Sequence, residues 1–303
     1  MLNFQMKLQS NLWRIKIVRN DFCAFILSHG RPHNVITYDK LRQHGYSGPI
    51  YIIIDNEDES ASGYYDKYGD EVVMFDKLAI SKTFDQADNF ENRKTIVYAR
   101  NACFEIAKTL GYKYFIQLDD DYYWFGLRST NVAVSTRNLD NLFSCLVKFL
   151  KETNVTTVAF SQGGDHIGGY DESKFISRKA MNSFICSVDN SFKFIGRINE
   201  DVNTYVKLGG LGKVFFTIMN IQLDQKDTQS NTGGMSGVYS NSGTYIKSFY
   251  TVLFSPSCVK IRLMGIHNRR LHHSISWKNA VPVIIREGHK KTINQNHITD
   301  GRN

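Results

Sequence analysis

The amino-acid sequence predicts a single compact α/β unit built on an open twisted sheet with flanking helices. Apolar runs with the length of buried strands alternate along the chain with segments of helical spacing. The early apolar runs end in polar loops, and 303 residues with 42% hydrophobic content are enough to form a sizeable core. In open sheets of this class ligands bind beyond the carboxyl ends of the strands, so those loops are the expected site.

The individual elements follow from the apolar spacing and from the residues that interrupt it. The expected strands are residues 21–27, 49–54, 71–75, 114–118 and 156–161. The expected helices are residues 35–44, 95–110 and 139–152. Gly111 is expected to end the helix that precedes it, as glycine commonly does. Residues 224–243 are polar and glycine-rich, and this stretch is long enough for a loop that closes over a ligand.

Charge and cysteine content narrow the class of protein. The net charge of +8 and the pI near 9.1 suit an acidic partner such as nucleic acid or a phosphorylated substrate. The five cysteines lie far apart without a CxxC pair, which disfavours a zinc site or a disulfide scaffold and predicts reduced core thiols. We expect no membrane partner and a cytoplasmic location, because no segment has the length and apolar character of a membrane span.

Three consecutive carboxylates, Asp119, Asp120 and Asp121, follow directly after an apolar strand. Crowded carboxylates repel one another and must be solvated, protonated or neutralised by a cation, so this run favours a divalent metal site. Asp119 and Asp121 would point the same way from an extended backbone. A solvated turn after the strand is the alternative interpretation.

Four motifs in a fixed order resemble the glycosyltransferases of the GT-A fold. They are Ser28-His29-Gly30-Arg31-Pro32, Asp55-Asn56-Glu57-Asp58, Tyr98-Ala99-Arg100-Asn101 before the aspartate run, and Asn199-Glu200-Asp201. Within that superfamily, residues 21–290 are similar to the TET-associated glycosyltransferases, which occur in phages and some eukaryotes and are thought to glycosylate hydroxymethylated pyrimidines in DNA. The local similarity includes Gly48-Pro49-Ile50-Tyr51-Ile52-Ile53-Ile54-Asp55, Val72-Val73-Met74-Phe75-Asp76-Lys77 and Gln117-Leu118-Asp119-Asp120-Asp121-Tyr122.

The resemblance implies a Rossmann-like GT-A sheet in one unit with two halves. Residues 1–20 would be a lead segment, 21–130 a nucleotide-sugar-binding half, 131–290 an acceptor-binding and catalytic half, and 291–303 a tail. The implied donor is a nucleotide-diphosphate sugar, with uridine as the expected base. Its implied contacts are Ser28, Gly30, Arg31, Asp55, Arg93, Arg100, Asp119 and Asp120. For Arg100 the alternative is an ordinary cation on a helix surface.

The resemblance also implies a divalent metal, Mn²⁺ or Mg²⁺, since both ions suit a shell made mainly of oxygen ligands. The ion would stabilise the negative charge that grows on the diphosphate leaving group. Asp121 and Asp119 are the implied carboxylate ligands, although the roles of the three aspartates are not assigned individually. His272 or His273 would complete the shell, and a surface pair of histidines is the alternative.

Asp201, with Glu200 as second choice, is the implied general base. A carboxylate at the start of a helix is kept ionised by the dipole and by free N–H groups, so it could accept a proton from an acceptor hydroxyl. An ordinary N-cap is the alternative. In an enzyme that retains the anomeric configuration, this acid would only position the substrate.

The leading hypothesis is metal-dependent transfer of a sugar to the hydroxymethyl group of a modified pyrimidine in DNA, in the host cytoplasm if the chain is phage-encoded. The aromatic residues 122–125 and the basic run 262–277 could stack on and steer the nucleic acid, whose target base would leave the duplex. The alternatives are the same chemistry on a glycan, lipid or protein, and a non-catalytic nucleic-acid-binding module, which leaves the aspartate run unexplained. A glycoside hydrolase is disfavoured, because adjacent carboxylates do not flank a sugar from opposite sides.

Overall fold

The computed structural model describes residues 19–88, 91–129, 132–166, 176–225, 245–265 and 269–282. Its strands are β1 (Phe22–Leu27), β2 (Ile50–Asp55), β3 (Val72–Phe75), β4 (Tyr114–Asp119), β5 (Tyr122–Ser129), β6 (Val132–Ser135), β7 (Val155–Gln162), β8 (Phe184–Ser187), β9 (Val214–Gln225), β10 (Val259–Met264) and β11 (Arg270–Ile275). Its helices are α2 (Ile36–Gln43), α3 (Ala61–Tyr68), α4 (Lys77–Ser81), α5 (Val97–Thr109), α6 (Leu139–Glu152), α7 (Glu200–Gly210), α9 (Ile246–Phe254) and α10 (Trp277–Ala280).

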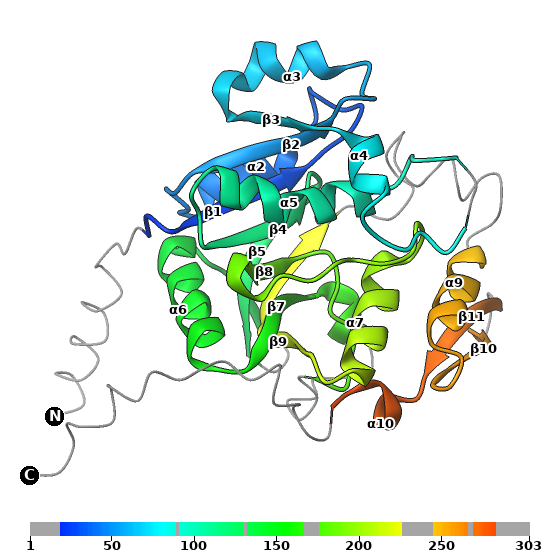
Figure 1. The fold of residues 1–303 in the computed structure, drawn as a ribbon. Coiled ribbons are helices and arrows are strands. Elements are labelled where there is room, and N and C mark those ends of the chain that lie inside the picture. Colours follow the sequence, from blue (N-terminus) through cyan, green and yellow to red (C-terminus); the bar gives the residue numbers. More distant parts are fainter. Residues whose placement is uncertain are drawn as a thin grey trace, which may run out of the picture.

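Nine strands of the described residues form one sheet in the order β3-β2-β1-β4-β8-β7-β9-β5-β6 (Figure 1). The first four of these are parallel, whereas β8 is antiparallel to β4. Helices lie on both faces, and the hairpin β10–β11 forms a second sheet at the edge of the molecule beside α9. The predicted α/β class, an open sheet with flanking helices, is confirmed, and the antiparallel strands make the sheet a mixed one.

Burial on both faces explains why the first strand is a continuous apolar run. Phe22, Ala24 and Ile26 pack into one cluster with residues of α2 and α6, while Cys23, Phe25 and Leu27 pack into another with residues of α5 and α7. A strand covered on both sides has no solvent face on which polar residues would alternate. The eight elements predicted from the sequence accordingly lie within two residues of their observed bounds.

Some expectations need correction. Of the five predicted core thiols, Cys23, Cys103, Cys186 and Cys258 are buried, but Cys145 is exposed, because it lies on the outer face of the amphipathic helix α6. All five cysteines are free thiols. Most of the glycine-rich stretch 224–243, the predicted tail 291–303 and nearly all of the predicted lead segment 1–20 lie outside the described residues. Within the described part of the chain, no helix has both the length and the apolar composition needed to cross a membrane.

Candidate active site

The strand order brings the motif loops together at one edge of the sheet. β1 lies between β2 and β4, so the order of the strands along the chain reverses between β1 and β4. Ligands of open α/β sheets bind beyond the carboxyl ends of the strands at such a switch point. Leu27 at the end of β1 lies beside Asp119 at the end of β4. The loop that follows β1 therefore lies next to the aspartate run.

Hydrogen bonds join the loop after β1 to the loop after β2. Asp55 Oδ2 lies 2.8 Å from His29 Nδ1 and accepts a hydrogen bond from it. Gly30 N donates to Asp58 Oδ2 at 2.7 Å, and Gly30 has φ of +72°, a conformation that glycine adopts without strain. Lys77 Nζ, at the start of α4, lies 3.1 Å from the same oxygen of Asp55 as His29. These contacts fix the shape of the loop before any ligand binds.

Asp55 is ionised in this arrangement, and both of its carboxylate oxygens accept hydrogen bonds. Burial by itself would raise its pKa, but the hydrogen bond from His29 and the charge of Lys77 outweigh burial, so the pKa of Asp55 is lowered. Its other oxygen, Oδ1, accepts a hydrogen bond from Glu57 N at 3.1 Å. Asp55 thus fixes the loop after β2 through bonds within the protein, and its predicted contact with a ribose stays a prediction.

A turn, not an extended strand, carries the aspartate run. β4 ends at Asp119, and Asp120 and Asp121 form the turn that leads into β5. Thr37 at the start of α2 holds this turn, because its Oγ1 donates to Asp119 O at 2.7 Å and accepts from Tyr122 N at 2.9 Å. The expectation of an extended backbone through Asp121 is therefore wrong. The alternative of a solvated turn is also wrong, since Asp120 is only 1% exposed.

Asp120 points back toward the loop after β1. Ser28 Oγ donates to Asp120 Oδ2 at 2.5 Å, and Arg31 Nη2 lies 2.9 Å from Asp120 Oδ1. Tyr64 Oη of α3 is 2.7 Å from the same Ser28 hydroxyl. Burial raises the pKa of Asp120 to about 6, although Arg31 and Ser28 favour its ionised form. The structure thus brings together three predicted site residues, Ser28, Arg31 and Asp120.

Arg100 connects the aspartate run to the start of α7. Its guanidinium lies in the centre of the molecule and is 1% exposed, so the alternative of a surface cation is wrong. Arg100 Nη2 is 3.0 Å from Asp119 Oδ1, and Arg100 Nε is 2.9 Å from Glu200 Oε1. Burial opposes its charge, but these two carboxylates raise the pKa of Arg100, so it stays cationic. The rings of Phe184 and Phe194 flank the guanidinium.

Carboxylates crowd around this arginine. Burial raises the pKa of Asp119 to about 6; Arg100 opposes that rise, while the charges of Asp121 and Glu200 add to it. The buried phenol of Tyr122 lies within electrostatic range of Asp119, Asp121 and Asp201. Asp119 and Asp121 therefore repel each other across the turn, which is the condition that a bound cation would relieve.

Asp201 lies in the first turn of α7 and is buried. Burial, followed by the charge of Glu200, raises the pKa of Asp201 to about 7, which opposes the effect expected of the helix start. Desolvation and a like charge outweigh the helix dipole here. The N-cap residue Asn199 makes no side-chain capping bond, and its Nδ2 donates to Thr251 Oγ1 at 2.6 Å. A carboxyl group that titrates near neutral pH suits a general base.

The two histidines proposed as metal ligands lie on β11. Burial first, then His272, Lys247 and Lys179, lower the pKa of His273 to about 3, so the ring is neutral and able to bind a metal. The charges that lower the pKa of His273 are those of lysine and histidine side chains. Within the described residues, no group of three or more His, Cys, Asp or Glu side chains converges to hold a metal ion. The ligand set of Asp119, Asp121 and a histidine stays a prediction.

Arg93 lies at the rim of the site. Its Nη2 is 2.7 Å from Glu57 Oε1 on the loop after β2, and both side chains are partly exposed. Of the predicted aromatic run, Tyr122 and Phe125 are buried in the core and cannot stack on a nucleic acid, whereas Tyr123 is exposed. Arg93 and Tyr123 remain accessible at the surface.

Several residues that build the site were not predicted. They are Thr37, Asp58, Tyr64 and Lys77, together with His29. His29, Asp58 and Lys77 lie inside motifs that carry the family resemblance, so their positions in the sequence could have identified them. Thr37 and Tyr64 belong to helices whose sequences carry no such signal.

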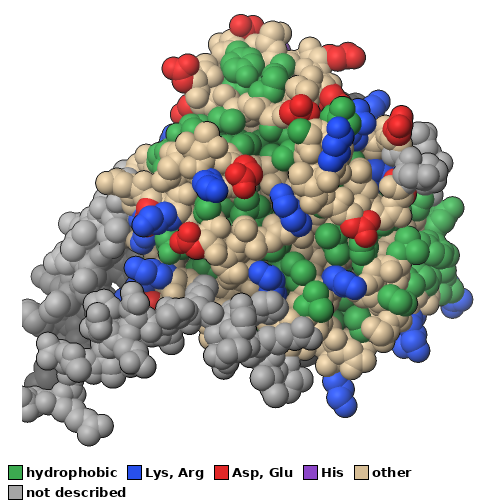
Figure 2. All heavy atoms as spheres, in the orientation of Figure 1, with side chains coloured by type: hydrophobic (Ala, Val, Ile, Leu, Met, Phe, Trp, Pro, Cys, Tyr) green, Lys and Arg blue, Asp and Glu red, His purple; other side chains and the backbone are tan. Residues whose placement is uncertain are grey.

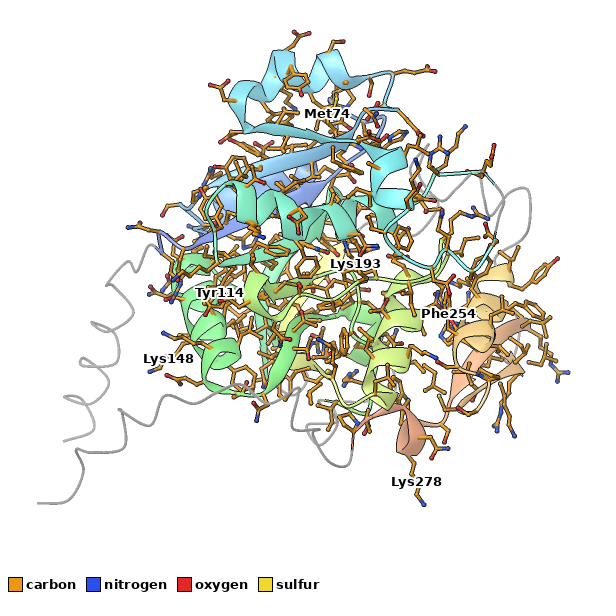
Figure 3. All side chains as sticks on the ribbon, viewed as in Figure 1. Met74, Tyr114, Lys148, Lys193, Phe254 and Lys278 are labelled. Carbon is orange, nitrogen blue, oxygen red and sulfur yellow. The ribbon has the colours of Figure 1, made fainter. Side chains whose placement is uncertain are left out.

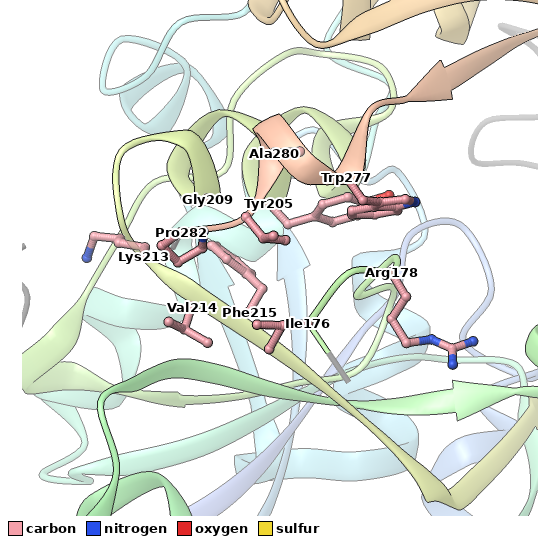
Figure 4. A pocket seen from close by; sticks show the side chains of 11 residues that line it. Ile176, Arg178, Tyr205, Gly209, Lys213, Val214, Phe215, Trp277, Ala280 and Pro282 are labelled. Carbon is pink, nitrogen blue, oxygen red and sulfur yellow. The ribbon is translucent and has the colours of Figure 1, made fainter. Parts of the chain in front are cut away.

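A small pocket lies at the other end of α7, between α7, β9 and α10 (Figure 4). Trp277 stacks on Tyr205 at one side of it, with ring centroids 5.8 Å apart and an angle of 19° between the planes. The side chains that line it include Lys213 and Arg178 but no carboxylate. This pocket therefore lacks the acids that the aspartate run and the start of α7 provide.

Comparison with known proteins agrees with these motifs. A model of the family described as TET-Associated Glycosyltransferase matches residues 22–234, which span β1 to the end of β9 and include every acid described above. No curated protein matches the chain. Among solved structures, the chain is similar to glucosyl-3-phosphoglycerate synthase from Mycobacterium tuberculosis in complex with Mn²⁺, UDP and phosphoglyceric acid. That similarity has a TM-score of 0.44 and 8% sequence identity, covering 87% of this chain and 88% of the other.

Proposed function

Because this chain belongs to the TET-associated glycosyltransferase family, we propose that it transfers a sugar from a UDP-sugar to the hydroxymethyl group of a modified pyrimidine in DNA. The chain is a glycosyltransferase. We further propose the UDP-sugar donor, the DNA acceptor, the GT-A fold and a cytoplasmic location. The observation that carries it is the buried acidic cluster at the switch point, where Arg100 joins Asp119 to Glu200.

The donor would bind where the loops after β1 and β4 meet. Residues 21–130 would supply this half of the site, with Ser28, Gly30 and Arg31 next to the nucleotide. Arg31 is about one-fifth exposed, with a side-chain exposure of 22%, and its backbone N–H donates to Tyr64 Oη at 2.8 Å. It can reach a phosphate while it stays paired with Asp120. Arg93 at the rim would meet the donor from the side of β2.

The residues at the turn fit a divalent cation. Their donors are carboxylate oxygens, which Mn²⁺ and Mg²⁺ prefer, and Asp119 and Asp121 already repel each other. Asp121 and Asp119 would hold the ion, and His273 or His272 would join them if the hairpin approaches the turn. When bound, the ion supplies Lewis-acid stabilisation of the charge on the departing diphosphate.

Residues 131–290 would bind the acceptor and supply the base. In an inverting transfer, Asp201 accepts the proton of the hydroxymethyl group as that oxygen attacks the anomeric carbon, and the bond from that carbon to the diphosphate breaks. Burial, and after it the charge of Glu200, keep the pKa of Asp201 raised, and Arg100 fixes the position of Glu200. The side chains of this chain thus orient the acid, remove water from around it and set its pKa near neutral.

The test combines one variant with three acceptors. Purified protein is incubated with a UDP-sugar and Mn²⁺, and transfer is measured to duplex DNA with hydroxymethylcytosine, to plain DNA and to oligosaccharides. We expect transfer only to the modified DNA. Asp121→Ala should reduce it roughly a thousandfold, because a metal contributes several kcal/mol to stabilisation of the leaving group. Asp66→Ala, at an exposed position on α3, is the matched control.

Two outcomes would contradict the proposal. Full activity of Asp121→Ala on a verified acceptor would remove the aspartate turn from the mechanism. Transfer to oligosaccharides with none to modified DNA would show that the chemistry is correct and the acceptor wrong. Circular dichroism of each variant separates a lost reaction from a lost fold.

A further inference from the structure

The hairpin β10–β11 is a regular two-stranded ribbon outside the region that the family model matches. Its strands pair from Val259 with Ile275 to Met264 with Arg270, over six residues each. Six residues span roughly 20 Å, and two paired strands are about 5 Å apart. Such a ribbon has the dimensions that the major groove of duplex DNA admits.

Cations occupy the outward face of this ribbon. Val259 and Ile275 pack into the core cluster beneath it, which fixes the opposite face as the outer one. Side chains alternate between faces along a strand, so Lys260 and Arg262 share the outer face with Arg270, which pairs with Met264 on that face. All three cations are exposed, as is Arg269 just before β11. The outer face is thus a row of exposed positive charges.

The surrounding sequence contains no acid to neutralise them. Residues 228–286 include no Asp or Glu, and they hold seven Lys and Arg residues: Lys247, Lys260, Arg262, Arg269, Arg270, Lys278 and Arg286. Among the described residues, Lys260, Arg262, Arg269 and Arg270 form no ion pair with a carboxylate. The neighbouring surface of α9 and the hairpin also exposes apolar side chains, which gather at this edge of the molecule in Figure 2.

We infer that the β10–β11 hairpin is a docking arm that binds duplex DNA through Lys260, Arg262, Arg269 and Arg270. The choice of DNA over another polyanion rests on the proposed function. A ribbon with cations on its outer face binds the phosphates that line a groove of the duplex.

The position of the arm relative to Asp201 supports this assignment. α9 packs against both α7 and the hairpin. Lys247 of α9 lies within electrostatic range of Asp201 on one side and of Arg270 on the other. DNA held by the hairpin would therefore lie next to the helix whose first turn carries the proposed base.

The experiment measures binding to an unmodified 20-base-pair duplex by fluorescence anisotropy at several salt concentrations, without donor or metal. The variant is Arg262→Gln with Arg269→Gln. We expect it to lower the slope of log K against log salt by about 2, since each phosphate contact contributes roughly 0.9. Affinity at 0.1 M salt should fall roughly tenfold or more for the same reason.

The matched control removes two charges from the far side of the molecule. Lys148→Gln with Lys151→Gln changes α6, which Figure 3 shows on the opposite side of the sheet from Phe254 and the hairpin. Its slope should stay at the wild-type value. Equal slopes for all three proteins would overturn the inference, because the arm would then make no phosphate contact.

Two further measurements separate other causes. If the hairpin variant keeps its DNA binding but loses binding to vesicles of anionic lipid, the arm is a membrane contact and the inference fails. Hydrolysis of a UDP-sugar by the wild-type protein without DNA tests the donor site alone. A protein that binds DNA through the hairpin but never hydrolyses donor would contradict the proposed function and leave the arm in place.

Discussion

Arginines in two regions of this molecule have opposite environments and therefore different roles. Arg100 lies buried on α5, bonded to two carboxylates, whereas Arg262 and Arg270 lie exposed on the hairpin with no carboxylate paired to them among the described residues. A buried cation between two acids fixes their geometry, and its loss leaves charges stranded away from water. An exposed cation contributes little to stability and stays available to a partner, at the cost of screening by salt. The buried arginine on the donor side therefore fixes the positions of side chains, whereas the exposed arginines of the hairpin can attract an acidic partner.

The largest expected effect is on stability at the buried arginine. Arg100→Met should lower the free energy of unfolding by about 3–5 kcal/mol, because Asp119 and Glu200 would lose their shared cation inside the protein. Arg270→Met, the same substitution on the hairpin, should change it by less than about 0.5 kcal/mol. Urea unfolding followed by circular dichroism measures both.

A second variant distinguishes stranded charge from lost packing. Arg100→Met with Glu200→Gln removes one of the two buried carboxylate charges, so it should recover part of the stability that Arg100→Met loses. No recovery would mean that the guanidinium matters only as volume between Phe184 and Phe194. Similar losses for Arg100→Met and Arg270→Met would break the comparison between the two regions.

The next largest effect is on the pH dependence of transfer, and it tests Asp201, which lies between the donor side and the hairpin. Asp201 must be ionised to accept a proton, and burial and Glu200 raise its pKa to about 7. The rate should therefore rise with pH through the neutral range and fall roughly tenfold for each pH unit below it. Glu200→Gln removes the like charge, so its profile should shift toward acidic pH.

The matched control for this profile is Glu105→Gln, at an exposed position on α5. Its rates across the pH range should follow those of the wild-type protein. If Glu200→Gln left the midpoint unchanged, or moved it toward alkaline pH, Asp201 would not be the group that titrates. Steady-state rates with saturating donor, measured from acidic to mildly alkaline pH, are sufficient to decide.

The sequence predicts the donor side of this molecule far better than the other side. β1 and β2 are apolar throughout because both of their faces are buried, and such runs are visible without any tertiary contact. The burial of Arg100 was not predictable, because it depends on Asp119 and Glu200, which lie 19 and 100 residues away along the chain. Helical spacing alone places that arginine on a face and says nothing about what covers it.

The same limit applies to Asp201 and the hairpin. An acid at a helix start predicts an ionised group, but desolvation and Glu200 reverse that tendency, and both depend on how α7 packs. In the hairpin, β10 alternates apolar and basic residues from Val259 to Leu263, whereas the two histidines of β11 interrupt such an alternation. Their pairing is a contact between two segments, so the sequence of either strand alone does not predict it.

The smallest expected effect is at the rim of the donor side, where Arg93 is partly exposed and, unlike the hairpin arginines, paired with Glu57. Arg93→Gln should change the free energy of unfolding by less than about 1 kcal/mol, as is usual for exposed pairs. If Arg93 also meets the donor, KM for the UDP-sugar should rise up to about fivefold with kcat unchanged, and the difference should shrink in high salt. Lys148→Gln, which loses an exposed pair with Glu152 on α6, should leave KM unchanged. An unchanged KM in Arg93→Gln would confine the donor to the buried side of the switch point, where Arg31 and Arg100 lie.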